Sequence, residues 1–295
     1  YELGMDGEIK STMRSDVVEL ARNNNVRVMP LLANTDGKTF SQKTVLNLLN
    51  NRANWEKVSN YMRAESKKNN FYGWQMDLEY IPVSHKEIFT EFIKYLRSEF
   101  NKDGLKLSIA VVSKISNNPK DYEAWYWNNW AGAYDYKVLS EYTDFLSIMA
   151  YDQPKGPGPV ATIGWSKKVL DYTLTQVPAS KISFGIPVYG WAYRSTDLKA
   201  GKKQFRMVDY LLTQTKLNNT STKLADKTTG HGTSNIFGNI SWVSYNYGGK
   251  NYTIWYEDKN SFIKKYNQLK SANVLGYSVW VLGDEDPAIW SLDSD

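Results

Sequence analysis

Cysteine is absent from the 295 residues, which excludes disulfide bonds, thiolate metal ligands and a cysteine nucleophile. The two histidines, His85 and His231, lie far apart in the sequence and do not indicate a zinc site. An excess of one charge is also missing, because 36 basic and 31 acidic side chains leave a net charge of only +5. The basic residues form no block of the kind that binds nucleic acid. We therefore expect no metal, no cofactor and no nucleic-acid partner.

Long apolar runs are missing as well. No stretch approaches the ~18 apolar residues that a membrane-spanning helix needs, so we expect no membrane span. The chain begins at Tyr1 rather than at Met and shows no signal-peptide pattern, so any targeting segment is expected to lie upstream. Aromatic residues, in contrast, are abundant, with 11 Trp and 21 Tyr. Those in loops suit the apolar faces of sugar rings, and the others are expected to pack around the core.

Short apolar, β-branched runs alternate with longer segments of helical periodicity, a pattern typical of a parallel sheet with crossover helices. The predicted strands are Val26 to Ala33, Tyr72 to Tyr80, Leu105 to Ser113, Phe145 to Tyr151, Ile182 to Tyr189 and Tyr277 to Leu282. The predicted helices are Asp16 to Asn24, Trp55 to Lys68, a helix that begins with a capping box of Ser84 and Glu87 and ends near Phe100, and Trp165 to Thr175.

The pattern predicts an α/β fold, a TIM-type (β/α)8 barrel that forms a single catalytic domain over residues 1–295. Such a barrel has eight strands, whereas six are clear and a weaker signal lies near Gly4 to Ile9. Either the first strand precedes Tyr1, which we favour, or the barrel is irregular. The alternation of strand-like and helical segments is interrupted at residues 194–259. We predict a small α+β insertion there, with strand-like pieces at Asn239 to Tyr245 and Tyr252 to Tyr256.

Three polar side chains alternate with apolar ones in the second clear strand. Gln75, Asp77 and Glu79 fall on one face of it, because side chains alternate along a strand. The two carboxylates are separated by roughly 7 Å along the strand, so ionisation of one is expected to raise the pKa of the other. Glu79 is nearer the carboxyl end, where barrel enzymes carry out their chemistry, and we predict that it is a general acid. The structural alternative is a buried carboxylate hydrogen-bonded to loop backbone.

This acidic strand resembles the motif Asp-x-x-Asp-x-Asp-x-Glu of glycoside hydrolase family 18, the chitinase family. Asp77 and Glu79 match its last two positions, whereas Tyr72 and Gln75 stand where the family has Asp. Three further segments resemble later strands of the family and occur in the expected order: SIMAYD at 147–152, GIPVYG at 185–190 and GYSVW at 276–280. The segments GPGPVATIGWSKKVLDY, IWYEDKNS and WVLGDEDPAIW are similar to the branch of bacterial spore-cortex and cell-wall N-acetylglucosaminidases.

The resemblance implies substrate-assisted retention, in which the 2-acetamido oxygen of the substrate attacks the anomeric carbon. It implies that Glu79 is the acid and base, that Asp77 holds the acetamido N–H, and that Tyr151 donates a hydrogen bond to the acetamido oxygen. It also implies that substrate binds to four further residues: Gln75, Asp152, Tyr189 and Trp280.

Each of these assignments has a structural alternative. The aromatic side chains could serve merely to pack the barrel interior: Tyr151, Trp280 and Tyr189. Asp152 could cap the loop that follows it. Another group, Trp255 to Glu257, could border the cleft from the insertion. Gln75 can hydrogen-bond to Asp77 but cannot carry negative charge, so the pKa of Asp77 should be lower than in a two-Asp arrangement.

Two functions follow from the resemblance. The first is hydrolysis of β-1,4-linked N-acetylglucosamine polymers, either chitin or peptidoglycan glycan, by a monomer that is secreted or associated with the cell envelope. The second is non-catalytic carbohydrate binding on the same barrel. Lectin-like members commonly lose the acid, and the presence of Glu79 therefore favours the enzyme. A phosphate-binding metabolic barrel is not supported, because no glycine-rich phosphate loop precedes a helix.

Overall fold

The structure, a computed structural model, describes residues 1–35, 37–154, 158–194, 205–208, 213, 225–231, 240–247 and 250–291. It consists of two compact units along the chain. The first unit comprises Tyr1–Ile148 with Tyr172–Ile182, and the second comprises Met149–Asp171 with Ser183–Asp295. In the part of the chain that the structure describes, no helix is both long enough and apolar enough to cross a membrane.

The sheet of the first unit runs in the order β6-β5-β4-β3-β1-β2. Its strands are β1 (Glu2–Leu3), β2 (Ile9–Lys10), β3 (Leu31–Ala33), β4 (Gly73–Asp77), β5 (Lys106–Val112) and β6 (Phe145–Met149). Parallel pairing joins β1 to β3, β3 to β4 and β4 to β5, whereas β2 is antiparallel to β1. The weak strand signal near Gly4 to Ile9 thus corresponds to β1, β2 and the turn between them, in which Gly4 N donates to Glu8 O.

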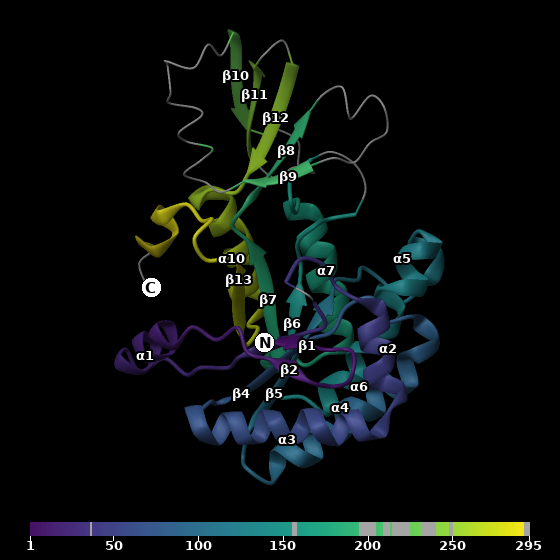
Figure 1. The fold of residues 1–295 in the computed structure, drawn as a ribbon. Coiled ribbons are helices and arrows are strands. Elements are labelled where there is room, and N and C mark those ends of the chain that lie inside the picture. The colour runs from purple at the N-terminus through teal and green to yellow at the C-terminus, as the bar shows by residue number, and fades with distance from the viewer. Residues whose placement is uncertain are drawn as a thin grey trace. The chain divides into compact units, whose positions relative to one another are not determined.

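Helices accompany this sheet in the first unit (Figure 1). They are α1 (Ser15–Asn23), α2 (Gln42–Asn50), α3 (Arg52–Asn69), α4 (Lys86–Asn101), α5 (Ala124–Asn129) and α6 (Tyr136–Glu141), with 3-10 turns η1 (Val83–His85), η2 (Pro119–Asp121), η3 (Ala131–Ala133) and η4 (Ala179–Lys181). Asn51 caps α3 by accepting from Ala53 N, and the helix ends where Asn70 takes a left-handed conformation. A side chain at the Ncap that accepts a backbone N–H stabilises a helix in this way.

Trp74 anchors the strand β4 to the helix α3. Its indole N–H donates to Met62 O at 3.1 Å and to Ser66 Oγ at 2.7 Å, and its side chain is fully buried. Burial of an aromatic side chain of this size contributes roughly 1.5–3 kcal/mol or more. At the edge of β4 that pairs with β5, a Cβ atom at Gly73 would lie 2.1 Å from Lys106 O, so only glycine allows this approach to β5. The position of β4 is therefore set from both sides.

The second unit contains a parallel pair of strands and an antiparallel sheet. β7 (Ile182–Pro187) pairs with β13 (Gly276–Trp280) in parallel. The five-stranded sheet has the order β10-β11-β12-β8-β9, with β8 (Gly190–Arg194), β9 (Phe205–Val208), β10 (Ala225–His231), β11 (Ser241–Tyr247) and β12 (Lys250–Tyr256). Val208, Val243 and Ile254 form its small core. Two helices and a turn complete the description: α7 (Ile163–Gln176), which contributes residues to both units, α10 (Lys259–Ala272) and η5 (Pro287–Ser291).

Most predicted strands and helices are confirmed within a few residues at their ends, and three details were wrong. The strand predicted from Val26 is formed only from Leu31 onward; Pro30, which has no N–H to donate, lies just before it. The capping box of Ser84 and Glu87 does not form, because Ser84 lies inside η1 and α4 begins after His85 without a side-chain cap. The strand predicted to reach Tyr80 ends at Asp77.

The segment predicted as an α+β insertion, residues 194–259, lies partly outside the described residues, and so does Asn239, the first residue of one predicted strand-like piece. Its described part contributes to the antiparallel sheet, in which β11 and β12 cover the predicted strand-like pieces. The helix α2 and the helix α10 were not predicted. α10 begins with a capping box between Asp258 and Ser261, a signal that the sequence contains.

Candidate active site

The carboxyl end of β4 is held by hydrogen bonds from outside the strand. The Asn34 side chain, which follows β3 and is fully buried, accepts from Glu79 N at 2.8 Å and donates to Glu79 O at 3.0 Å. Tyr134 Oη donates to Leu78 O at 2.6 Å. The backbone of Leu78 and Glu79 therefore bonds to side chains rather than to a neighbouring strand, which is why β4 ends at Asp77 although Glu79 stays fixed.

Asp77 is a buried carboxyl group with incomplete hydrogen bonding. Its side chain is 8% exposed, and its Oδ1 atom accepts no hydrogen bond from any of the described residues. Burial raises the pKa of Asp77 from 3.8 to about 7, because the low-dielectric surroundings disfavour the charged form. The group can therefore exchange a proton near neutral pH, and it has an oxygen atom available for a donor from outside the protein.

Glu79 is equally buried and lies near two tyrosine hydroxyl groups. Its exposed fraction is also 8%. Burial and then the charge of Glu79 raise the pKa of Tyr80, and burial followed by the charges of Glu79 and Asp77 raises the pKa of Tyr134 well above its ordinary value. Both phenols thus stay protonated and can act only as neutral hydroxyl groups next to the carboxylate.

At Asp77 the cause of the raised pKa is burial and not the charge of Glu79, which differs from the expectation. For Glu79 the expected mutual repulsion stays a prediction. Gln75 also makes a different contact from the one considered, because its Oε1 accepts from Ser108 Oγ on β5 at 3.0 Å. Within the described part of the chain no hydrogen bond joins Gln75 to Asp77. Gln75 and Asp77 thus lie within β4, whereas Glu79 lies two residues beyond the end of the strand.

A group of aromatic rings begins with Tyr80, the residue after Glu79, and we call Tyr80, Trp125 and Trp130 the aromatic face. The Tyr80 ring stacks on Trp130 with 5.3 Å between centroids and meets the edge of Trp125 at 6.0 Å. Trp125 on α5 is 60% exposed. Tyr80 has a positive φ of 58°, an uncommon conformation for a non-glycine residue, which turns the chain sharply after Glu79. Rings arranged in this way can bind the apolar faces of sugars.

The other predicted site residues belong to the second unit. Tyr151 and Asp152 follow β6, Tyr189 follows β7, and Trp280 ends β13. Tyr189 Oη donates a hydrogen bond to Asp152 Oδ1. Burial raises the pKa of Asp152, although the hydrogen bond from Tyr189 opposes this. Asp152 therefore binds a tyrosine from another strand end, and packing alone does not account for Tyr189.

Tyr151 and Trp280 are brought together as two nearly parallel rings. Their centroids are 6.5 Å apart with an interplanar angle of 16°. Trp280 is 46% exposed, so it does not serve only to fill a core. Its carbonyl oxygen accepts from Val188 N at 3.0 Å, which ties the end of β13 to the residue before Tyr189.

Sequence reasoning missed several residues that shape these groups. Asn34 could have been found, because it is a polar residue directly after a buried strand, whereas no local pattern marks Tyr134. Glu257 was considered as a residue bordering the cleft, but it is 2% exposed and pairs with the buried Lys265 at 2.6 Å. Glu257 therefore forms a buried ion pair within the protein. No cluster of three or more histidine and acidic side chains suited to a metal occurs among the described residues.

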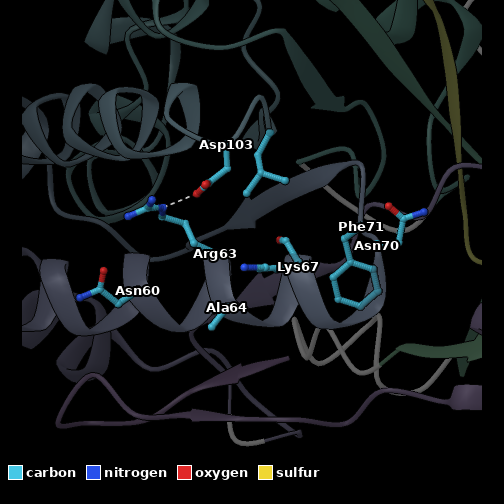
Figure 2. Close-up of a pocket in the computed structure, with 9 residues that line it drawn as sticks. Asn60, Arg63, Ala64, Lys67, Asn70, Phe71 and Asp103 are labelled. Carbon is cyan, nitrogen blue, oxygen red and sulfur yellow. Dashed lines mark hydrogen bonds and ion pairs between the residues drawn. The ribbon is translucent and has the colours of Figure 1, made fainter.

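Two adjoining cavities of about 620 and 590 Å³ lie elsewhere in the first unit. Both are lined by residues that precede β4 and β5, including Phe71 and Leu105, so they lie at the amino ends of these strands. Figure 2 shows Arg63 directed toward Asp103 across the larger one, and Arg63 also pairs with Glu99 at 3.2 Å. The charge of Arg63 is thus compensated inside the protein, and none of the predicted site residues lines either cavity.

Comparison with known proteins identifies the family. The model of glycosyl hydrolases family 18 matches residues 5–286. The cortical fragment-lytic enzyme of Bacillus subtilis (strain 168) is 25% identical over 299 residues, which cover 100% of this chain and 66% of that protein. A class V chitinase of Arabidopsis thaliana is 24% identical over 239 residues, which cover 73% of this chain and 59% of that protein.

A solved structure shares the fold. The crystal structure of the spore cortex-lytic enzyme SleL of Bacillus megaterium QM B1551 matches with a TM-score of 0.85 and 24% identity, over 99% of this chain and 64% of that one. The chain thus spans about two thirds or less of the length of each of these relatives. Its fold is the α/β fold of TIM-barrel chitinases, as the alternation of strands and helices predicted. The chain belongs to family 18 of the glycosyl hydrolases.

Proposed function

We propose that this chain hydrolyses β-1,4-linked N-acetylglucosamine polymers, chitin or the glycan strands of peptidoglycan, by a substrate-assisted retaining mechanism. One observation carries the proposal: Asp77 and Glu79 are buried at the carboxyl end of β4, and Asp77 keeps an oxygen atom without a partner among the described residues. Family membership and the names of the relatives support a glycan as the substrate. Such a substrate places the working protein outside the cell or in its envelope.

In the first step, the acetamido oxygen of the substrate attacks the anomeric carbon while the glycosidic bond breaks. Glu79 gives its proton to the leaving oxygen, so the leaving sugar departs as an alcohol. Asp77 Oδ1 accepts the acetamido N–H, which aligns the attacking oxygen and stabilises the positive charge of the oxazolinium ion. This role accounts for the buried oxygen without a partner, because such an atom costs free energy unless a ligand satisfies it.

In the second step, water attacks the anomeric carbon of the oxazolinium ion from the face that the leaving group vacated. Glu79, now ionised, accepts a proton from this water and returns to its starting state. The acetamido group is regenerated, and the product keeps the configuration of the substrate. The hydrogen bonds from Asn34 and Tyr134 keep the backbone of Glu79 in place through both steps.

Residues of the second unit take the roles that the family pattern implies. Tyr151 donates its hydroxyl group to the acetamido oxygen, and the half-exposed ring of Trp280 provides an apolar surface for the sugar. Asp152 and Tyr189, joined by their hydrogen bond, bind further hydroxyl groups of the substrate. The aromatic face extends the binding surface beyond Glu79, which favours a polymer over a single sugar.

The replacement Glu79→Gln tests the proposal, because the amide keeps the shape of the side chain and has no acidic proton to give. A fluorogenic N-acetylglucosamine oligomer is expected to be hydrolysed by the parent protein and at least about 100-fold more slowly by the variant, with binding retained. Glu91→Gln on α4, an exposed glutamate paired with Lys94, is the matched control. Equal rates of hydrolysis by Glu79→Gln and the parent would contradict the assignment of Glu79 as the acid. Binding without hydrolysis by the parent would also contradict it, and would favour a carbohydrate-binding protein.

The substrate is identified by its products. Mass spectrometry of digests of chitin oligomers and purified peptidoglycan, run side by side, reports which polymer is cleaved and whether the bonds are internal or terminal. Release of fragments from neither polymer would contradict the proposed substrate class.

A further inference from the structure

Lys114 is a buried cation outside the acidic strand. It follows β5 by two residues, and its side chain is 1% exposed. Its Nζ donates to Tyr134 O at 2.6 Å and to Asn117 Oδ1 at 3.1 Å. Three aromatic rings surround the ammonium group, at 5.6, 4.9 and 5.9 Å from their centroids: Trp127, Tyr136 and Tyr172.

No carboxylate forms an ion pair with Lys114 among the described residues. The acid that acts on it is Asp135, which itself pairs with Lys86 at 2.7 Å. Burial lowers the pKa of Lys114 from 10.5 to about 8, which reflects the removal of the charge from water. A buried ammonium group costs free energy that an apolar side chain of similar size would not. Its contacts therefore point to a specific positioning role.

The contacts of Lys114 lead to the backbone of the acidic strand. The carbonyl group of Tyr134 accepts from Lys114, and the hydroxyl group of the same residue donates to Leu78 O at 2.6 Å. Leu78 is the residue before Glu79. Tyr136 is fastened in the same manner, since its hydroxyl group donates to Val112 O on β5 at 2.6 Å. Two tyrosines that hold the ends of β4 and β5 are thus in contact with one ammonium group.

The same ammonium group contacts the helix that carries the aromatic face. Trp127 belongs to α5, which also contains the exposed Trp125, and Trp130 follows the helix. The chain turns tightly after α5, because a Cβ atom at Gly132 would lie 2.6 Å from Trp127 O. Movement of Trp127 would therefore displace both tryptophans that meet the ring of Tyr80.

We propose that Lys114 is a positioning residue that holds residues 115–134 against the ends of β4 and β5, and thereby orients the aromatic face for a long sugar chain. The inference rests on the proposed function of Glu79. It assigns Lys114 to the length preference of the enzyme rather than to bond cleavage, because no contact of Lys114 reaches the carboxyl groups of Asp77 or Glu79 directly.

Lys114→Met tests the inference, because methionine has a similar length and no N–H to donate. We expect KM for a hexamer of N-acetylglucosamine to rise about tenfold, because a tenfold loss of affinity corresponds to the loss of roughly one aromatic stacking contact. For a short aryl glycoside, KM and kcat are expected to change less than about threefold. Lys114→Arg, which keeps charge and donors, is expected to restore most of the affinity for the hexamer.

Two comparisons separate positioning from general stability. Arg97→Met, which removes a bond to Tyr142 O at 3.0 Å and an ion pair with Asp144, should lower the melting temperature and leave the ratio of long to short substrates unchanged. Trp125→Ala should reproduce the loss for the hexamer, and the double variant with Lys114→Met should lose no more than either single variant.

A fall in melting temperature with an unchanged ratio of long to short substrates would overturn the inference, as would losses that multiply in the double variant. Should Lys114→Met not fold, Lys114→Gln, which keeps an amide donor, takes its place in the same comparison. Calorimetric binding of the hexamer is measured in parallel. If the parent binds but does not hydrolyse, the function proposed for Glu79 fails, whereas the role of Lys114 is still decided by the binding data.

Discussion

Replacement of Asp77 by asparagine removes one buried negative charge and changes little else in the shape of the side chain. Asp77 is 8% exposed, and burial raises its pKa from 3.8 to about 7. The two pKa values differ by about 3, and each unit of difference corresponds to about 1.36 kcal/mol. The ionised carboxylate therefore destabilises the folded protein by about 4 kcal/mol relative to its protonated form.

The sign of the pH dependence follows from proton binding. Folding raises the pKa of Asp77, so the folded protein binds the proton more tightly than the unfolded chain does. Its contribution to the free energy of unfolding falls as the pH rises from about 4 to about 7, and it is constant above the folded pKa. Asp77→Asn has no proton to lose, so the variant should gain stability relative to the parent across this window, by about 4 kcal/mol in total.

The measurement is urea unfolding of both proteins between pH 4 and pH 8.5, followed by tryptophan fluorescence. Asp144→Asn is a control of opposite sign. Burial of Asp144 is outweighed by hydrogen bonds from Arg97 and Leu107 N, which hold its pKa below the ordinary value. Its replacement should therefore cost stability, and this cost should stay nearly constant between pH 4 and pH 8.5, because a lowered pKa places the titration of Asp144 below this range.

A constant difference in stability between Asp77→Asn and the parent from pH 4 to pH 8.5 would refute the reasoning. It would mean that the carboxyl group titrates alike in the folded and unfolded states, and that burial does not perturb it.

Two further predictions concern the residues around Asp77 and Glu79. Gln75→Asp introduces a carboxylate near Asp77, which should raise the pKa of Asp77 further and move the pH profile of kcat/KM to higher pH. A profile that does not move, or moves to lower pH, would show that the two side chains do not interact. Asn34→Ala removes the two hydrogen bonds that the Asn34 side chain makes with Glu79 N and O, so we expect a loss of about 2–4 kcal/mol in urea unfolding and a lower kcat. Unchanged stability would count against this contact.

The helix and strand pattern of the first unit could be read from the sequence because it is local. Apolar alternation marks β4, β5 and β6 within each segment, and helical periodicity marks α3. The acidic strand and the segments after β6 and β7 could be found in the same way, since a few consecutive residue types define each. Family membership followed from these segments, and the family match over residues 5–286 agrees with it.

The end of β4 and the state of its carboxyl groups required the tertiary structure. Glu79 is held by Asn34, which is 45 residues away in the chain, and Leu78 by Tyr134, which is 56 residues away. No local pattern encodes a hydrogen bond over such a separation. The sequence alone determined which residue types meet at the strand end, whereas burial, which depends on everything packed around Asp77, decided its pKa. Long-range packing is the physical reason for the difference, because desolvation is a property of the surroundings and not of the residue.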